Sequence, residues 1–295
     1  MRTHLRKARE VYEGGGPLQT VKTAVRYAPI EVNNFVFWLR HGSGTRVMDE
    51  DWDNLLILDG CRYDMFADRI DIDGRLESRI SLGSSSEEFL ERNFGDEAFH
   101  DTVYINANPY IPKLGLDDGT FHAVVDCLGE WDAELQTVQP ETVADTARRA
   151  HDRYPDKRLI VHFMQPHAPF IGKRGRALIG GGWTMNREVE KEEQGIWHHL
   201  RHDEVDVDID EFWAAYKENL DVALDEVERL LDTLGGKSVI TADHGNLVGE
   251  RLSPIPTRRK YGHPYGVHTE ELLKVPWFVI GSETRRETRS EPPES

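Results

Sequence analysis

The sequence has 295 residues, of which 38% are apolar, and its 53 acidic and 36 basic side chains give a formal net charge of −17. This acidity excludes general binding to nucleic-acid phosphates, because like charges repel, and it suits a solvated surface in a high-salt cytosol. No window reaches the roughly 20 apolar residues of a membrane-spanning helix, and the first residues lack the apolar core of a secretory leader, so we expect a cytoplasmic protein.

Residues 1–46 differ in charge from the rest of the chain. They hold eight basic and three acidic residues, which leaves 28 basic and 50 acidic residues, a net of −22, for the remainder. We expect one or two helices here, broken at Gly14–Pro17. The stretch Val21–Leu39 mixes apolar, aromatic and basic residues. We interpret it as a helix packed on the body, and a peripheral membrane contact through residues 1–46 is the alternative.

From Asp53 onward the sequence alternates between strand and helix patterns. Continuous apolar runs are typical of strands that are covered on both faces, as in mostly parallel sheets. The expected strands are Asn54–Leu58, Thr102–Ile105, Leu159–Phe163, Ser238–Thr241 and Trp277–Ile280. One expected helix begins near Ser85, and two others span Pro140–Tyr154 and Asp210–Leu234. We therefore predict an α/β fold with a mostly parallel central sheet sandwiched between helices.

Composition also suggests how the chain is divided. The segment Gly172–Arg201 contains several glycines and a run of charged residues, so we expect it to form a loop or a lid. Cys61 and Cys127 are in no metal-type motif, so we expect two small buried side chains. The expected units are a helical basic extension (1–46), a catalytic domain (47–283) and a disordered tail (284–295).

Polar side chains follow two of the expected strands, at the position where open α/β sheets place ligand sites. Asp59 and Gly60 follow the first of these strands. Asp243 and His244 follow the other, and both can serve one site if the chain turns at Gly245. Two carboxylates and an imidazole predict one divalent metal ion, zinc or manganese, with calcium or magnesium as alternatives. The competing interpretation is a helix cap and an exposed polar turn.

Three serines, residues 84–86, lead into an expected helix. Ser85 and Glu88 have the spacing of a capping box, so the helix should begin near Ser85. Ser86 would then lie in the first turn, where free amides and the positive helix end stabilise an anion. Because a nearby metal can activate a hydroxyl, we predict Ser86 as nucleophile and metal ligand, with Ser84 and Ser85 as alternatives.

Three histidines are further candidates. His167 lies between two prolines beyond an expected strand end, and His263 lies between a glycine and a proline. Both are expected to contact substrate oxygens, and His167 is a predicted catalytic residue. His162 lies within the expected strand, which favours a structural role. The alternatives are a contact with substrate or, as for His263, a place among the ligands of a second metal.

These segments, in this order, resemble the alkaline phosphatase superfamily, closest to its sulfatase-like branch. The similar motifs are Asp59-Gly-Cys-Arg-Tyr-Asp64, Pro166-His-Ala-Pro-Phe170, Thr241-Ala-Asp-His-Gly245 and Val275-Pro-Trp-Phe-Val279. The resemblance covers most of the chain, from about Asp53 to Ile280, and implies an alkaline phosphatase-like α/β/α fold.

The resemblance also implies roles for individual residues. Asp59, Asp243 and His244 would bind the metal, with Ser86 as ligand and as the nucleophile that forms a phosphoserine. Water or an acceptor alcohol would then resolve this intermediate. His167 and His263 would contact the non-bridging ester oxygens of the substrate. His162 and Arg62 are also expected at the substrate, and Arg62 would in addition brace the first loop.

The chain departs from true sulfatases in two places. The C/S-x-P/A-x-R motif is absent near Ser86, and the paired Asp-Asp is reduced to Asp59-Gly60. The pattern therefore resembles phosphodiesterases and phosphoethanolamine or glycerol-phosphate transferases. We expect a metal-dependent hydrolase or transferase acting on a small-molecule, glycan-linked or lipid-linked phosphate ester. The alternatives are a sulfatase with unmodified serine and an inactive phosphoglycan-binding module, and the sequence does not indicate the oligomeric state.

Overall fold

The computed structural model describes residues 27–178, 196–202 and 207–293. Its strands are β1 (Asn54–Leu58), β2 (Arg75–Ile80), β3 (Phe99–Asn106), β4 (Phe121–Asp126), β5 (Arg158–Phe163), β6 (Ser238–Thr241), β7 (Leu247–Glu250), β8 (Lys260–Gly262) and β9 (Lys274–Ile280). A helix over 27–41 is followed by α2 (Tyr63–Arg69), α3 (Ser86–Phe94), α4 (Tyr110–Lys113), α5 (Pro140–Arg153), α6 (Lys173–Leu178), α7 (Ile196–Arg201), α8 (Ile209–Leu231) and α9 (Glu270–Leu273).

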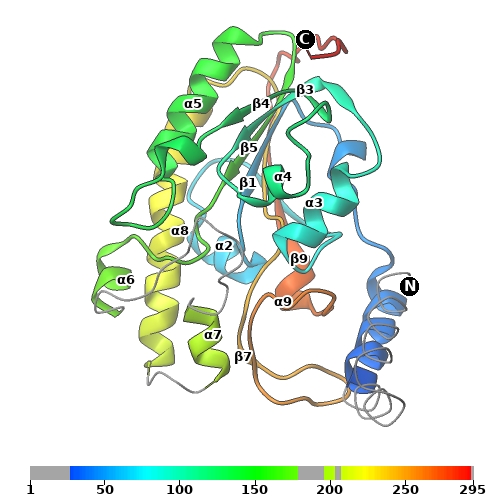
Figure 1. The fold of residues 1–295 in the computed structure, drawn as a ribbon, viewed down its shortest axis with the longest axis vertical. Coiled ribbons are helices and arrows are strands. Elements are labelled where there is room, and N and C mark those ends of the chain that lie inside the picture. The colour runs from blue at the N-terminus through cyan, green and yellow to red at the C-terminus, as the bar shows by residue number, and fades with distance from the viewer. Residues whose placement is uncertain (1–26, 179–195, 203–206, 294–295) are drawn as a thin grey trace.

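A seven-stranded sheet with the order β2-β9-β6-β1-β5-β3-β4 forms the centre of the molecule (Figure 1). The five strands from β6 to β4 are parallel, whereas β9 is antiparallel to both of its neighbours. The short strands β7 and β8 form a separate antiparallel pair. The predicted α/β fold with a mostly parallel sheet is confirmed.

The two faces of the sheet are covered by different helices. Along β1, Leu56 and Leu58 belong to the core that is shared with α2, α5 and α8. Leu55 and Ile57 alternate with them and pack with α3 and α4 on the opposite face. All five residues of β1 are buried, as its continuous apolar run predicts for a strand covered on both sides. The predicted sandwich of a sheet between helices is also confirmed (Figure 1).

All five expected strands are present, but two outer strands of the main sheet were not predicted. Strand β2 lies at one edge and alternates charged with apolar residues, so it lacks the continuous apolar run of the central strands. Strand β4 lies at the other edge and is largely half-buried. Helix α8 ends at Leu231, earlier than the predicted Leu234, and a turn follows before Gly236 adopts a positive φ of 92°.

Several expectations concern segments outside the sheet. The expected loop or lid over Gly172–Arg201 begins and ends in the helices α6 and α7, while residues 179–195 lie outside the described residues. The break expected at Gly14–Pro17 lies outside them as well. The expected helix before residue 44 is present over 27–41, and none of the described helices is long and apolar enough to cross a membrane.

Residues 284–293 have no helix or strand but make defined contacts with the body. Arg285 forms ion pairs with Asp51 and Asp53, and Arg286 donates a hydrogen bond to the Lys157 carbonyl at 2.6 Å. The described part of the expected disordered tail is therefore attached to the body, and the expected boundaries between the three units stay a prediction. The two cysteines are buried free thiols, as expected.

Candidate active site

Two carboxylates meet where β1 and β6 end. These strands are parallel neighbours, with Ile57 opposite Thr241, so the residues that follow them reach the same edge of the sheet. Asp59 is 2% exposed, and Asp243 and His244 are fully buried. The Asp243 carboxylate accepts hydrogen bonds from the amide of Gly60 at 2.9 Å and from that of His244 at 2.8 Å. The turns after the two strands are thus fixed to each other.

Glycine is required in both turns. Gly60 has a φ of 67°, and a Cβ there would lie 2.6 Å from the Asn246 side-chain nitrogen. A Cβ on Gly245 would lie 2.1 Å from the Glu271 carbonyl oxygen. The close approach to backbone, rather than a positive φ, explains the second glycine.

The structure distinguishes the three serines at the beginning of α3, of which Ser86 is the first residue of the helix. Ser85 caps the helix, with its Oγ accepting from the Glu88 amide at 3.4 Å. The Ser84 hydroxyl donates to the Glu88 carboxylate at 2.8 Å. The Ser86 hydroxyl lies 2.7 Å from Asp243 Oδ2, 3.1 Å from Asp59 Oδ2 and 3.3 Å from His244 Nε2. Of the three, it is Ser86 that joins the Asp–Asp–His group.

The Asp–Asp–His group has the composition of a metal site. One ligand atom each from Asp59, Asp243 and His244 lie within 4.8 Å of one another, and all three residues are buried. The Oδ1 atom of Asp59 is buried without a hydrogen-bond partner among the described residues. Buried carboxylates need compensation, so a cation fits this group.

The protonation of the two carboxyls leads to the same conclusion. Burial and the neighbouring Asp243 raise the pKa of Asp59 well above its usual value. Burial also acts to raise the pKa of Asp243, but His244, His162 and hydrogen bonds lower it below its usual value. A divalent ion beside the two carboxyls would offset the burial and the repulsion that raise the pKa of Asp59.

His162 lies against the two carboxylates and has no exposed surface. Its Nε2 is 3.9 Å from Asp59 Oδ2 and 4.0 Å from Asp243 Oδ2, with no hydrogen-bond partner among the described residues. Its Nδ1 is 2.6 Å from the Tyr104 hydroxyl. Burial raises the pKa of that phenol well above its usual value, so the phenol stays protonated and donates to Nδ1. The Nε2–H of His162 then faces the carboxylates. Its expected contact with substrate stays a prediction.

His167 and His263 form a pair beside the metal-type group. Their Nε2 atoms are 3.0 Å apart, and the His263 ring centroid is 4.5 Å from that of His244. The Nδ1 of His167 donates to the Ala168 carbonyl at 2.7 Å, so the Nε2 of His167 is an acceptor and His263 supplies the shared hydrogen. The sequence-predicted histidines 167, 244 and 263 are therefore adjacent.

Arg62 connects the first loop to the segment after β6. Its guanidinium contacts the Asp64 carboxylate at 2.6 and 2.9 Å, Glu250 at 2.6 Å and the Asn246 carbonyl at 3.1 Å. It also lies over the Trp213 ring, 4.8 Å from its centroid. These contacts support the bracing role. An additional role at the substrate stays a prediction.

One residue of the site was not predicted. Asn108 donates from its side-chain nitrogen to Asp59 Oδ2 at 2.9 Å. It lies just beyond β3, in a turn where the Asn106 side chain accepts from the Asn108 amide at 2.9 Å. Two asparagines and a proline directly after an apolar run indicate such a turn, and this was the available sequence signal. Asn108 orients the Asp59 carboxylate.

The buried histidines predict acid sensitivity of the metal-free protein. Burial lowers the pKa of His162 and His167 from 6.5 to about 4, and lowers that of His263 well below 6.5. Between pH 6.5 and these lowered pKa values, protons bind the histidines of the unfolded chain but not those of the folded chain. Each histidine therefore lowers the free energy of unfolding by about 1.4 kcal/mol for each pH unit toward acid. Asp59 acts in the opposite sense. Its pKa is raised in the folded chain, so the folded chain binds this proton first and becomes more stable as the pH falls. The effect of the three imidazoles on the free energy of unfolding outweighs that of one carboxyl.

Urea unfolding of chelator-treated protein between about pH 7.5 and pH 5 measures this slope. In a His167→Asn variant, the dependence of the unfolding free energy on pH should be smaller than in the wild type by the contribution of one histidine. A free energy of unfolding that is constant, or that rises toward acid, would contradict the burial of three neutral imidazoles.

The α/β sandwich thus brings two carboxylates, an imidazole and the serine that begins α3 to one edge of the sheet, where open α/β folds place their ligand sites. No family model and no curated protein matches the sequence. Among solved structures, the integral membrane protein lipooligosaccharide phosphoethanolamine transferase A (EptA) from Neisseria meningitidis matches with a TM-score of 0.48 and 13% identity, over 96% of this chain and 59% of that chain.

Two further structures match. The C-terminal periplasmic domain of EptC from Escherichia coli, solved in complex with Zn, has a TM-score of 0.47 and 12% identity, over 78% of this chain and 72% of that chain. A protein in the alkaline phosphatase superfamily from Vibrio parahaemolyticus has a TM-score of 0.38 and 11% identity, over 81% and 61%. This chain spans 59% of the length of the EptA structure that it matches. At such identities the chemistry has to be inferred from the residues of the site.

Proposed function

We propose that this protein is a metal-dependent hydrolase or transferase of phosphate esters, with Ser86 as the nucleophile. The observation that carries the proposal is the position of the Ser86 hydroxyl, 2.7 to 3.3 Å from one atom each of Asp243, Asp59 and His244. These three side chains would hold zinc or manganese, which suit a mixed carboxylate and imidazole set. A divalent ion there would supply positive charge that lowers the hydroxyl pKa and polarises the ester.

In the first half of the reaction, Ser86 Oγ forms a bond to phosphorus while the bond from phosphorus to the leaving alcohol breaks. Asp243 Oδ2, at 2.7 Å, accepts the hydroxyl proton. The leaving oxygen takes up one proton from solvent, and the attacking oxygen of the second half returns one to solvent, so protons balance over the two halves. His263 can donate its Nε2–H to a non-bridging oxygen once that hydrogen is released from His167.

In the second half, water or an acceptor alcohol attacks the phosphoserine. The new oxygen–phosphorus bond forms as the bond to Ser86 Oγ breaks, and Asp243 returns the proton to the serine. The attacking oxygen loses its own proton to solvent. The acceptor alone therefore decides between hydrolysis and transfer.

The substrate class is tested by a panel of esters. Nitrophenyl phosphate, bis-nitrophenyl phosphate and nitrophenyl sulfate are compared by kcat/KM with zinc or manganese present. Phosphatidylethanolamine with a free alcohol acceptor is included because we propose a lipid-linked or glycan-linked phosphate ester as the natural substrate. We expect turnover of a phosphate ester to exceed that of the sulfate. Faster turnover of the sulfate would favour a sulfatase with unmodified serine, and ligand binding without turnover would favour an inactive binding module.

A further inference from the structure

The helix over 27–41 (dark blue in Figure 1) presents several apolar side chains to solvent. Five of the seven large apolar side chains that are exposed in the described residues belong to it, so the exposure is concentrated rather than scattered. They are Tyr27 (50% exposed), Val32 (43%), Phe35 (57%), Trp38 (52%) and Leu39 (62%). Phe35 lies three residues after Val32, three before Trp38 and four before Leu39, and Tyr27 lies two helical turns before Phe35, so the five residues share one side of the helix with the acidic Glu31. We call these five residues the apolar face.

The opposite side of this helix is fixed to the body by polar groups. The Asn33 side chain donates to the Ile255 carbonyl at 2.9 Å and accepts from its amide at 2.8 Å. The Asn34 side chain donates to the Gly266 carbonyl at 2.8 Å and accepts from the His268 amide at 2.9 Å. Rotating the helix to bury the apolar face would break these hydrogen bonds, of which one is buried and three are partly buried, so the face is held outward.

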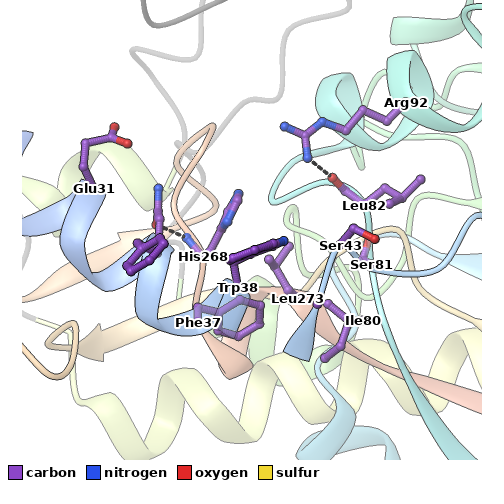
Figure 2. A pocket seen from close by; sticks show the side chains of 13 residues that line it. Glu31, Phe37, Trp38, Ser43, Ile80, Ser81, Leu82, Arg92, His268 and Leu273 are labelled. Atoms are coloured by element: carbon purple, nitrogen blue, oxygen red, sulfur yellow. Dashed lines mark hydrogen bonds between the residues drawn. The ribbon is translucent and has the colours of Figure 1, made fainter. Parts of the chain in front are cut away.

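A cleft of about 590 Å³ lies beside the apolar face. Phe35 and Trp38 line it from the helix, and Ile80 and Leu273 line it from β2 and α9. Figure 2 shows Trp38, Ile80 and Leu273 around this cleft. The Arg92 side chain, which is 47% exposed, lies at the same cleft, where it pairs with the Glu88 carboxylate at 2.6 Å and donates to the Leu82 carbonyl at 2.7 Å. Exposed aromatic side chains next to a cleft of mixed apolar and polar lining match the chemistry of a lipid interface.

The charge of the chain favours one occupant of this face. Residues 1–46 hold eight basic and three acidic residues, whereas the remainder holds 28 basic and 50 acidic ones. A second copy would bring another acidic body, which opposes association. An anionic bilayer attracts the basic segment, which includes this helix and the residues that precede it in the sequence, and repels the acidic remainder.

We infer that the apolar face of helix 27–41 is a contact surface for an anionic phospholipid bilayer. The contact is peripheral, with aromatic side chains at the level of the lipid headgroups. The segment that Asn34 holds, at Gly266 and His268, follows His263 directly in the sequence. The bilayer contact is thereby linked to a loop of the candidate site, although binding itself does not depend on the proposed reaction.

The test is cosedimentation of the full chain with vesicles of phosphatidylcholine containing about one third phosphatidylglycerol. The wild type should bind these vesicles, and bind pure phosphatidylcholine more weakly. The triple substitution Phe35→Ser, Trp38→Ser and Leu39→Ser should lower the partition coefficient by about tenfold or more. Ile209→Ser, which removes an apolar side chain 38% exposed on α8, is the matched control and should bind like the wild type.

Circular dichroism and the thermal midpoint verify that the triple variant is folded, which we expect because the three side chains are exposed. Wild type that stays in the supernatant would overturn the inference, and so would a folded triple variant that binds as well as the wild type. Light scattering that shows a wild-type dimer and a monomeric triple variant, without vesicle binding, would assign the face to a second copy instead.

Discussion

Replacing Ser86 with alanine is expected to lower kcat/KM for a phosphate ester by about 10³-fold or more, because the attacking oxygen is removed. Metal binding should be largely retained, since two carboxylates and an imidazole remain. The folded state should lose on the order of 1 kcal/mol, because the hydroxyl donates to a buried carboxylate. Steady-state kinetics on bis-nitrophenyl phosphate, with calorimetric metal titration, measures both quantities.

Ser85→Ala is the matched control for this substitution. The Ser85 hydroxyl caps α3 instead of facing the carboxylates. Its loss should cost about 1 kcal/mol of stability and leave kcat/KM within a few-fold of the wild type. If Ser86→Ala kept full activity while Ser85→Ala lost it, the nucleophile would be Ser85 and the geometry of the described serines would not be that of the working enzyme.

Replacing Asp243 with asparagine is expected to reduce metal affinity by at least about 100-fold and to remove turnover with it. The amides of Gly60 and His244 can still donate to the asparagine oxygen. Removing one of two buried carboxylates also relieves the repulsion that raises the pKa of Asp59. The metal-free variant should therefore be as stable as the wild type, or more stable.

Thermal unfolding with and without metal separates these effects. A ligand at 100 times its Kd stabilises a protein by about 2.7 kcal/mol, so added zinc or manganese should raise the midpoint of the wild type and leave that of Asp243→Asn unchanged. Asp221→Asn is the control, because this partly exposed carboxylate pairs with Arg69 and is not part of the Asp–Asp–His group, and the variant should keep the metal-induced rise. An equal rise in Asp243→Asn would exclude Asp243 as a ligand.

The parts of the site that sequence could predict are those set by local pattern. A buried apolar run that ends on Asp59, and a second that ends on Asp243, place two carboxylates at one sheet edge once the strands are parallel. The spacing of Ser85 and Glu88 located the start of α3 and hence Ser86. In each case a few neighbouring residues determine the conformation, so the pattern is readable without the fold.

Other features depend on packing between distant segments. The contact of Asn108 with Asp59 joins residues 49 positions apart, and the contact of His167 with His263 joins residues 96 positions apart. The strand β2 is at a sheet edge, where charged residues replace the apolar signal. Helix 27–41 departs from the usual amphipathic rule, because it buries Asn33 and Asn34 and exposes Phe35 and Trp38.

The central claim is that Asp59, Asp243 and His244 hold one cation in front of the Ser86 hydroxyl. Anomalous scattering from crystals soaked in zinc or manganese tests it most directly. The expected result is an anomalous peak in contact with all three side chains, at about 2.0 to 2.2 Å from the ligand atoms, with Ser86 Oγ adjacent. A soaked crystal whose peaks lie elsewhere, with these three side chains free of metal, would contradict the claim.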